Sequence, residues 1–206
     1  MTDSGLWTLI FAERAALADD LAALTDERWA TPSLCEGLSV REVLAHLTSA
    51  ARLTPVRWLA GVVRCRFDFD LQVAMRLREQ LGASPEETLE RFRGAVTSRT
   101  KPLSAIAMLG ETVVHGEDIR RPLGIRRDHP IGTLTRLAGY YVGSNQVVPA
   151  KGRVRGLRLA ADDGPFASGS GPLVTGSTLA LIMAMAGRGD YLDELSGDGT
   201  AILRER

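Results

Sequence analysis

The sequence lacks the features that most often reveal a partner or a compartment. Cysteine occurs only twice in 206 residues, at Cys35 and Cys65, so we expect free thiols in a reducing compartment rather than a disulfide framework. Neither sign of charge predominates, with 25 Lys plus Arg and 25 Asp plus Glu, which gives no indication of nucleic acid or an anionic membrane as a partner. The longest apolar run, residues 179–187, is shorter than the roughly 18 residues that span a bilayer. No apolar secretory segment follows the polar start of the chain, and we therefore expect a cytoplasmic protein.

The composition is that of an ordinary globular protein. Hydrophobic residues make up 45% and charged residues 24% of the chain, close to the average of folded domains. A chain of this length can bury a core without disulfides, as one larger domain or as a domain of about 150 residues with a small appendage.

One stretch near the middle of the chain combines acidic residues with a histidine at helical spacing. Glu111, His115 and Asp118 stand at positions i, i+4 and i+7, so they share one face of the expected helix. Such a stripe is suited to hold a metal. Ser104 and Met108 continue it, and the alternative is a solvated strip on a mostly buried helix, where a Glu–His pair adds only about 0.2–0.5 kcal/mol.

Periodicity and capping signals predict a helical N-terminal part and a mixed C-terminal part. Ser39 and Glu42 form an S-x-x-E capping box at the start of a helix that carries His46. Other helices are expected from about residue 3 to before residue 29, and over 71–81, 85–98, 102–119, 131–147 and 178–186. Strands are expected over 154–159, 173–174 and 201–203, with a loop over 162–172. The predicted fold class is α+β, mainly α, with a helical bundle over residues 1–149 and a small α/β domain over 150–206.

Four arginines crowd the turn after the helix that carries His115. Cations at this place complement the negative end of a helix, so we expect a solvated basic rim, with an anion site as the alternative. The four are Arg120, Arg121, Arg126 and Arg127.

Two segments together resemble the signatures of a known family. Residues 29–47 resemble the pattern W-x-x-P-[ST]-x-C-x-G-W-[ST]-V-x-[DE]-V-x-x-H-[LI] of the mycothiol-dependent maleylpyruvate isomerase family, with Leu38 in place of the second tryptophan. Residues 111–124 resemble its second signature, E-x-x-x-H-x-x-D-I-x-R-P-L-G. The tail is similar to the family's small C-terminal domain at residues 157–159, 174–176, 187–188 and 195–199. The resemblance implies a DinB-like up-and-down bundle followed by a small α/β domain.

The same resemblance implies a metal site and a thiol cofactor. Its metal ligands correspond to His46, Glu111 and His115 in this sequence, and the metal is usually zinc. Two imidazoles and one carboxylate leave at least one coordination position open, as in catalytic rather than structural zinc sites. The resemblance further implies that mycothiol is the reacting thiol. Zinc lowers the pKa of a bound thiol, so the nucleophilic thiolate would be present at neutral pH.

Three further residues have two interpretations each. Asp118 lies one turn past His115 and either fixes the tautomer of an imidazole or is a surface residue at the helix end. Arg188 follows an apolar helix at the family's Gly-Arg position and either binds a substrate carboxylate with its planar fork or caps that helix. Cys35 is either a soft metal ligand or a small buried residue that shapes the loop before the His46 helix.

The expected function is that of a metal-dependent enzyme. We expect mycothiol to attack an electrophilic small molecule, in a cis–trans isomerisation or a thiol S-transfer, catalysed by a monomer or a homodimer. The alternatives are a non-catalytic metal-binding sensor of a ligand or thiol, and a hydrolase that uses the open coordination position for hydroxide. The hydrolase is the less favoured because only His129 remains as a further histidine base, in a loop flanked by proline.

Overall fold

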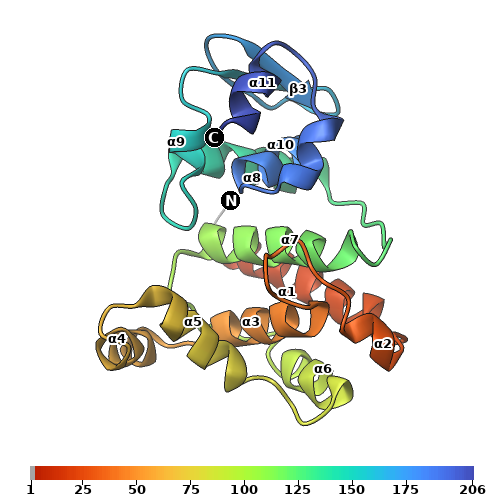
Figure 1. The fold of residues 1–206 in the computed structure, drawn as a ribbon, viewed down its shortest axis with the longest axis vertical. Coiled ribbons are helices and arrows are strands. Elements are labelled where there is room, and N and C mark those ends of the chain that lie inside the picture. Colours follow the sequence, from red (N-terminus) through yellow and green to blue (C-terminus); the bar gives the residue numbers. More distant parts are fainter. Residues whose placement is uncertain (1–2) are drawn as a thin grey trace. The chain divides into compact units, whose positions relative to one another are not determined.

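The computed structural model describes residues 3–206, and in it the chain divides into two compact units (Figure 1). The N-terminal unit ends at Arg126 and the C-terminal unit begins at Arg127. This division lies before the boundary expected between residues 149 and 150. The reason is that α8 (Ile131–Gly143) packs against α10 (Thr178–Met185), an element of the C-terminal unit.

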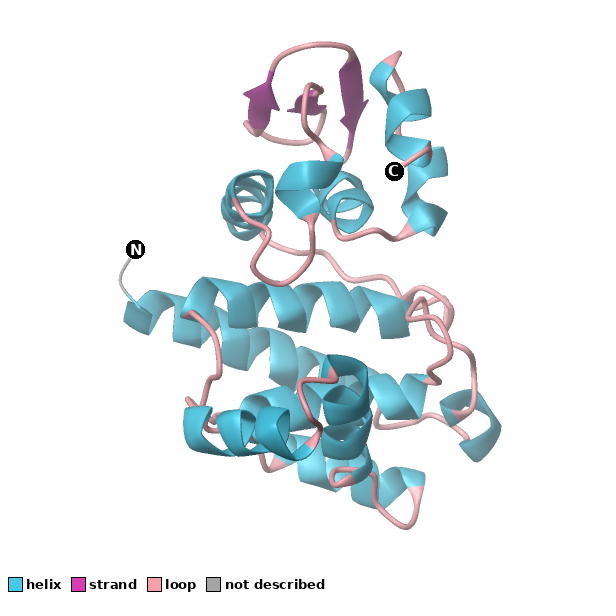
Figure 2. Ribbon diagram, turned by 60° about the vertical axis from the view of Figure 1, so that its left-hand side comes forward, coloured by secondary structure: helices cyan, strands magenta, loops and turns pink. Residues whose placement is uncertain are grey.

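The N-terminal unit is a helical bundle, as predicted (Figure 2). Helix α7 packs against α1 and α3, and α6 packs against the same two helices. Their shared core is built from buried aliphatic and aromatic side chains, among them Leu17, Leu44, Phe92 and Ile119. The helices of this unit are α1 (Asp3–Asp20), α2 (Asp26–Trp29), α3 (Val40–Arg52), α4 (Pro55–Arg64), α5 (Phe69–Arg78), α6 (Pro85–Arg93) and α7 (Ala105–Arg120).

Helix α3 begins where the sequence predicted. The Ser39 side chain accepts a hydrogen bond from the backbone N–H of Glu42, and the Glu42 carboxylate accepts one from the backbone N–H of Ser39, at 2.8 Å. This reciprocal pair satisfies two amides that the helix itself leaves free. It therefore fixes the start of the helix that carries His46.

Helix α7 is buried on nearly all sides. Thirteen of its 16 residues are buried, including Met108 and Asp118. Glu111 and His115 keep 13% and 15% of their side-chain surface exposed, so the stripe is largely buried and only partly open to solvent. The prediction of a solvated basic rim is wrong for Arg120, whose side chain is 1% exposed. Its guanidinium lies 2.7 Å from the carboxylate of Asp20 and 3.6 Å from that of Glu117, because a buried charge requires partners of opposite sign.

The C-terminal unit is a small α/β domain. Strand β1 (Arg158–Ala161) lies between β2 (Ala167–Gly169), which is antiparallel to it, and β3 (Leu173–Gly176), which is parallel to it. The remaining elements are α8, α9 (Ala150–Arg153), α10, the 3-10 helix η1 (Gly189–Glu194) and α11 (Gly199–Arg204). The predicted mainly α fold with a small α/β part is thereby confirmed. Along residues 3–206, no helix combines the length and the apolar character needed to cross a membrane.

Three local predictions in this unit were wrong. Residues 201–203 lie in helix α11 rather than in a strand, because a three-residue apolar run carries no period that distinguishes the two. The expected strand over 154–159 begins only at Arg158, since Gly156 adopts a positive φ of 73° and turns the chain. The expected loop over 162–172 contains β2.

Replacement of the α3 cap tests its contribution to stability. We expect Ser39→Ala to lower the free energy of unfolding by about 0.5–2 kcal/mol, because the amide of Glu42 loses its partner. Denaturant titration followed by circular dichroism measures this. Thr8→Ala, at an exposed position in α1, serves as the control and should change stability by less than about 0.5 kcal/mol. An equal effect of the two substitutions would contradict the role of the capping box.

Candidate metal centre

Three side chains from two helices converge on one point in the N-terminal unit. One carboxylate oxygen of Glu111, on α7, lies 3.5 Å from Nε2 of His46, on α3. The same oxygen lies 3.5 Å from Nε2 of His115, one turn further along α7. The two imidazole rings stand edge to face, with centroids 4.8 Å apart. The structure thus brings together the three residues that the sequence proposed as metal ligands, whose ligand atoms all lie within 4.8 Å of one another.

The spacing of these donor atoms fits a metal ion. Two ligands bound at 2.0–2.1 Å to a tetrahedral ion stand about 3.3–3.4 Å apart, and the two nitrogen–oxygen distances here are 3.5 Å. Imidazole nitrogen and carboxylate oxygen are ligands that zinc accepts. The side chains of His46, Glu111 and His115 retain 22%, 13% and 15% of their exposure, so a small molecule can reach the group.

Asp118 holds His115 in the orientation that this arrangement requires. Its carboxylate oxygen lies 2.8 Å from Nδ1 of His115, and its side chain is fully buried. A proton on Nδ1 donated to this carboxylate leaves Nε2 free to bind a cation. The interpretation of Asp118 as a surface residue at the helix end is therefore wrong.

Cys35 lies beside this group and forms, with His115 and Asp118, a second group that could hold a metal ion, so its interpretation as a soft ligand stays a prediction. Its sulfur lies 3.0 Å from the Asp118 carboxylate, to which the thiol donates, and 3.4 Å from Nδ1 of His115. The backbone N–H of Leu34 also donates to the carbonyl oxygen of Asp118, at 3.1 Å. The loop before α3 is thus attached to α7 beside the metal candidates. The available sequence signal was the position of a cysteine in the segment that leads into the His46 helix.

The electrostatics of the group favour opposite charges on Glu111 and His115. Burial alone would raise the pKa of Glu111, but hydrogen bonds from His115 and His46 outweigh it and hold that pKa far below its ordinary value. Burial would lower the pKa of His115, but its hydrogen bonds to Asp118, Cys35 and Glu111 raise it well above 6.5. Without a metal, a proton on His115 therefore balances the buried carboxylates.

Arg188 lies in the C-terminal unit, at the end of α10. Its guanidinium donates a hydrogen bond of 2.9 Å to the carbonyl oxygen of Ala186, the C-cap residue of α10. This contact is the one expected if Arg188 caps its helix. The three metal candidates belong to the N-terminal unit.

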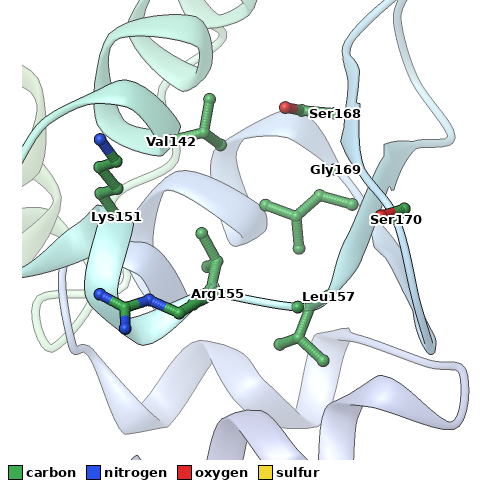
Figure 3. Close-up of a pocket in the computed structure, with 10 residues that line it drawn as sticks. Val142, Lys151, Arg155, Leu157, Ser168, Gly169 and Ser170 are labelled. Carbon is green, nitrogen blue, oxygen red and sulfur yellow. The ribbon is translucent and has the colours of Figure 1, made fainter.

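A separate cavity of about 270 Å³ lies in the C-terminal unit (Figure 3). Lys151, Arg155, Ser168 and Ser170 supply polar groups around an apolar lining. None of the residues that the sequence proposed for the site lines this cavity.

Comparison with known proteins supports the resemblance of the first signature and of the fold. Residues 10–106 match the family model described as the mycothiol maleylpyruvate isomerase N-terminal domain; the match includes His46 and ends before Glu111. Two crystal structures of the mycothiol-dependent maleylpyruvate isomerase, one of them a histidine-to-alanine mutant, share the fold with TM-scores of 0.66 and 0.65. Each covers 97% of this chain and 94% of its own, at 18% and 16% identity. No curated protein matches the chain significantly.

The protonation of His115 predicts that metal binding releases a proton. At neutral pH the pKa of His115, well above 6.5, keeps both ring nitrogens protonated in the metal-free protein. The pKa of Glu111 is lowered, so its carboxylate has no proton to lose. We expect about one proton released per bound zinc ion, and an affinity that falls about tenfold for each pH unit below the pKa of His115. Calorimetry in buffers of different ionisation enthalpy measures the released protons, and a value near zero would contradict this assignment.

The orientation of His115 by Asp118 predicts a loss of metal affinity in Asp118→Asn. We expect zinc to bind about 10- to 100-fold more weakly, because a neutral amide is a weaker acceptor for the imidazole N–H. Cys35→Ala should also weaken zinc binding, but by less than Asp118→Asn does. Cys35→Ser keeps an O–H donor to Asp118, so this variant should bind zinc nearly as tightly as wild type. Competition with a chromophoric chelator measures the affinities. Asp19→Asn, at an exposed position, is the control and should leave affinity unchanged.

Proposed function

We propose that this chain is a zinc-dependent enzyme that uses mycothiol as its nucleophile, on the premise that residues 10–106 match the model of the mycothiol maleylpyruvate isomerase N-terminal domain. The observation that carries the proposal is the convergence of His46, Glu111 and His115 at 3.5 Å around one carboxylate oxygen. Three ligands of this kind, partly open to solvent, are typical of a catalytic site because they leave a coordination position for a reactant.

The residues of the chain prepare the site before any reactant binds. Glu111 supplies a negative charge whose lowered pKa keeps it ionised. Asp118 directs Nε2 of His115 toward Glu111 by accepting the proton of Nδ1. Zinc in this site would lower the pKa of the mycothiol thiol, so that the thiolate predominates at neutral pH.

The reaction that fits this site begins with addition of the thiolate to an electron-poor double bond of a small molecule. The sulfur–carbon bond forms as the π electrons move to the electron-withdrawing group. Rotation about the resulting single bond and expulsion of the thiolate give the trans isomer, with no net oxidation. If the adduct instead takes up a proton and is released, the same site performs an S-transfer. Binding of a substrate carboxylate or of the cofactor by Arg188 stays a prediction from the family resemblance, based on the planar fork of its guanidinium.

Both reactions require a metal ion bound by His46, Glu111 and His115, and the metal content of the protein tests this premise. We expect close to one equivalent of zinc in the purified wild-type protein, and loss of most of it in His46→Ala, His115→Ala and Glu111→Gln, because each removes one of three ligands. Elemental analysis measures this. His129→Ala replaces the third histidine of the chain, which lies outside the ligand group, and should retain the metal. Equal zinc content in all four variants would disprove the assignment.

Two measurements distinguish an enzyme from a sensor: binding of mycothiol, and mycothiol-dependent turnover of an electrophilic substrate. Calorimetry should show mycothiol binding to the zinc-loaded protein and not to His115→Ala. Isomerisation of a cis-unsaturated keto acid, followed by its absorbance, should then require both the metal and the thiol, and Arg188→Ala should raise KM more than it lowers kcat. Thiol binding without turnover of any electrophile would favour the sensor. A zinc-loaded protein that does not bind mycothiol would exclude both reactions.

A further inference from the structure

Helices α4 and α5 follow one another in the chain and lie near each other (Figure 1). This hairpin exposes a concentration of large apolar side chains. Ten such side chains are markedly exposed in the described part of the chain, and eight of them lie between positions 56 and 73. We call these eight the hairpin surface. They are Val56, Trp58, Leu59, Val63, Phe67, Phe69, Leu71 and Val73.

Helix α4 is apolar on its outer side as well as its inner side. Its inner residues Gly61 and Val62 are buried. Its outer residues Val56, Leu59 and Val63 are 79%, 58% and 61% exposed, and their spacing of three and four residues places them in one stripe. Its remaining side carries Arg57 and Arg64, so α4 is amphipathic, and its apolar face is wider than the part that is buried. This stripe has the spacing with which one helix packs against another.

The hairpin is fixed with its apolar side outward. The Gln72 side chain donates to the carbonyl oxygen of Trp58 at 2.9 Å, and Arg76 donates to that of Arg57 at 2.7 Å. At the tip, Arg66 and Phe67 have φ values of 53° and 67°, and in the described part of the chain no other non-glycine residue has a positive φ. Such strain persists where the surroundings impose it and is concentrated at functional positions. Here it presents Phe67, which is 69% exposed.

Charges of both signs border the hairpin surface without partners of their own. Arg64, Arg66 and Asp70 are exposed, and none of them forms an ion pair within residues 3–206. An anionic membrane would favour basic residues alone around the apolar stripe. A twofold interface brings the same surface opposite itself, so a border with both signs is complementary to a second copy.

The size of the hairpin surface also suits a second copy. Aromatic side chains carry 150–250 Å² each, so Trp58, Phe67 and Phe69 with their observed exposed fractions offer about 300 Å². The outer stripe of α4 adds the aliphatic surface of Val56, Leu59 and Val63. The largest apolar patch of a typical monomer is about 300–600 Å². A stable protein–protein interface buries about 800 Å² on each partner.

We propose that two copies of this chain form a twofold-symmetric dimer through the hairpin surface. The outer stripe of α4 packs against the same stripe of its partner, and Arg64 and Arg66 face Asp70 of the partner subunit. This assignment is independent of the metal site and goes beyond the proposed activity.

Sedimentation velocity over a range of concentrations tests the dimer with the full chain. The wild-type protein should sediment as a dimer that dissociates on dilution. Leu59→Asp places a charge in the centre of the stripe and should raise the dissociation constant by more than about tenfold. Ile131→Asp introduces the same charge at another exposed apolar residue, 40% exposed and outside the hairpin, and should leave dimerisation unchanged.

Phe67→Gly separates loss of the interface from loss of the fold. Glycine adopts a positive φ without strain, so the monomer should be no less resistant to urea than wild type, while the dimer should weaken about tenfold or more. A variant that dimerises as wild type would contradict the role of Phe67 at the interface.

An exchange of charges identifies the partner as a second copy. Asp70→Arg should weaken the dimer because it places an arginine opposite Arg64 and Arg66 of the other copy. The double variant Arg64→Asp with Arg66→Asp should also weaken it, because two aspartates then face Asp70. An equimolar mixture of the two should form heterodimers more tightly than either variant forms homodimers. The proposal is overturned if the wild-type protein stays monomeric at every concentration, or if the monomer instead binds vesicles of anionic phospholipid through Leu59.

Discussion

The structure of the site depends on a single carboxylate oxygen that two helices share. Glu111 reaches His46 on α3 and His115 on α7 with the same atom, so any movement between these helices changes both distances. The position of this oxygen is in turn set by α7, which is enclosed on nearly all sides. The capping box of Ser39 and Glu42 fixes the start of α3, and the packing of α3 against α7 sets the position of His46 relative to Glu111.

Burial of charged groups gives this part of the bundle its specificity. A buried charge is costly unless it is paired, and the last turns of α7 contain several. His115 is paired with Glu111 and Asp118, and Arg120 with Asp20 and Glu117. A shift of α7 by one residue would leave these groups without partners. The arrangement that allows a cation to bind is therefore the one that the bundle requires for its own stability.

The two ends of the N-terminal unit use apolar residues differently. Around Leu44 and Phe92 they are enclosed and form the core. Along α4 they face solvent on one side, with Phe67 held outward by a strained backbone. The buried core and the exposed apolar stripe thus lie in different helices of the same unit.

The sequence by itself determined the helical class, the cap of α3, and the residue types and spacing of the metal candidates. These properties depend on residues within one or two turns of each other, and the helical period and capping rules describe such neighbours well. His46 lies far along the chain from Glu111 and His115. Only the resemblance to the family signatures identified it as a third candidate ligand. Short apolar runs such as residues 201–203 carried too little local information, and in the structure they lie in α11, which packs against β3 and η1.

Only the tertiary structure decided which polar groups are buried and what they contact. It buried Asp118 at the end of the stripe, paired Arg120 with Asp20, and brought Cys35 to the carboxylate of Asp118. It also placed α8 with the C-terminal unit. The physical reason is that a residue is buried by segments that are far apart in the chain. A local pattern therefore does not determine whether a given helix face is exposed to solvent or packed against another helix.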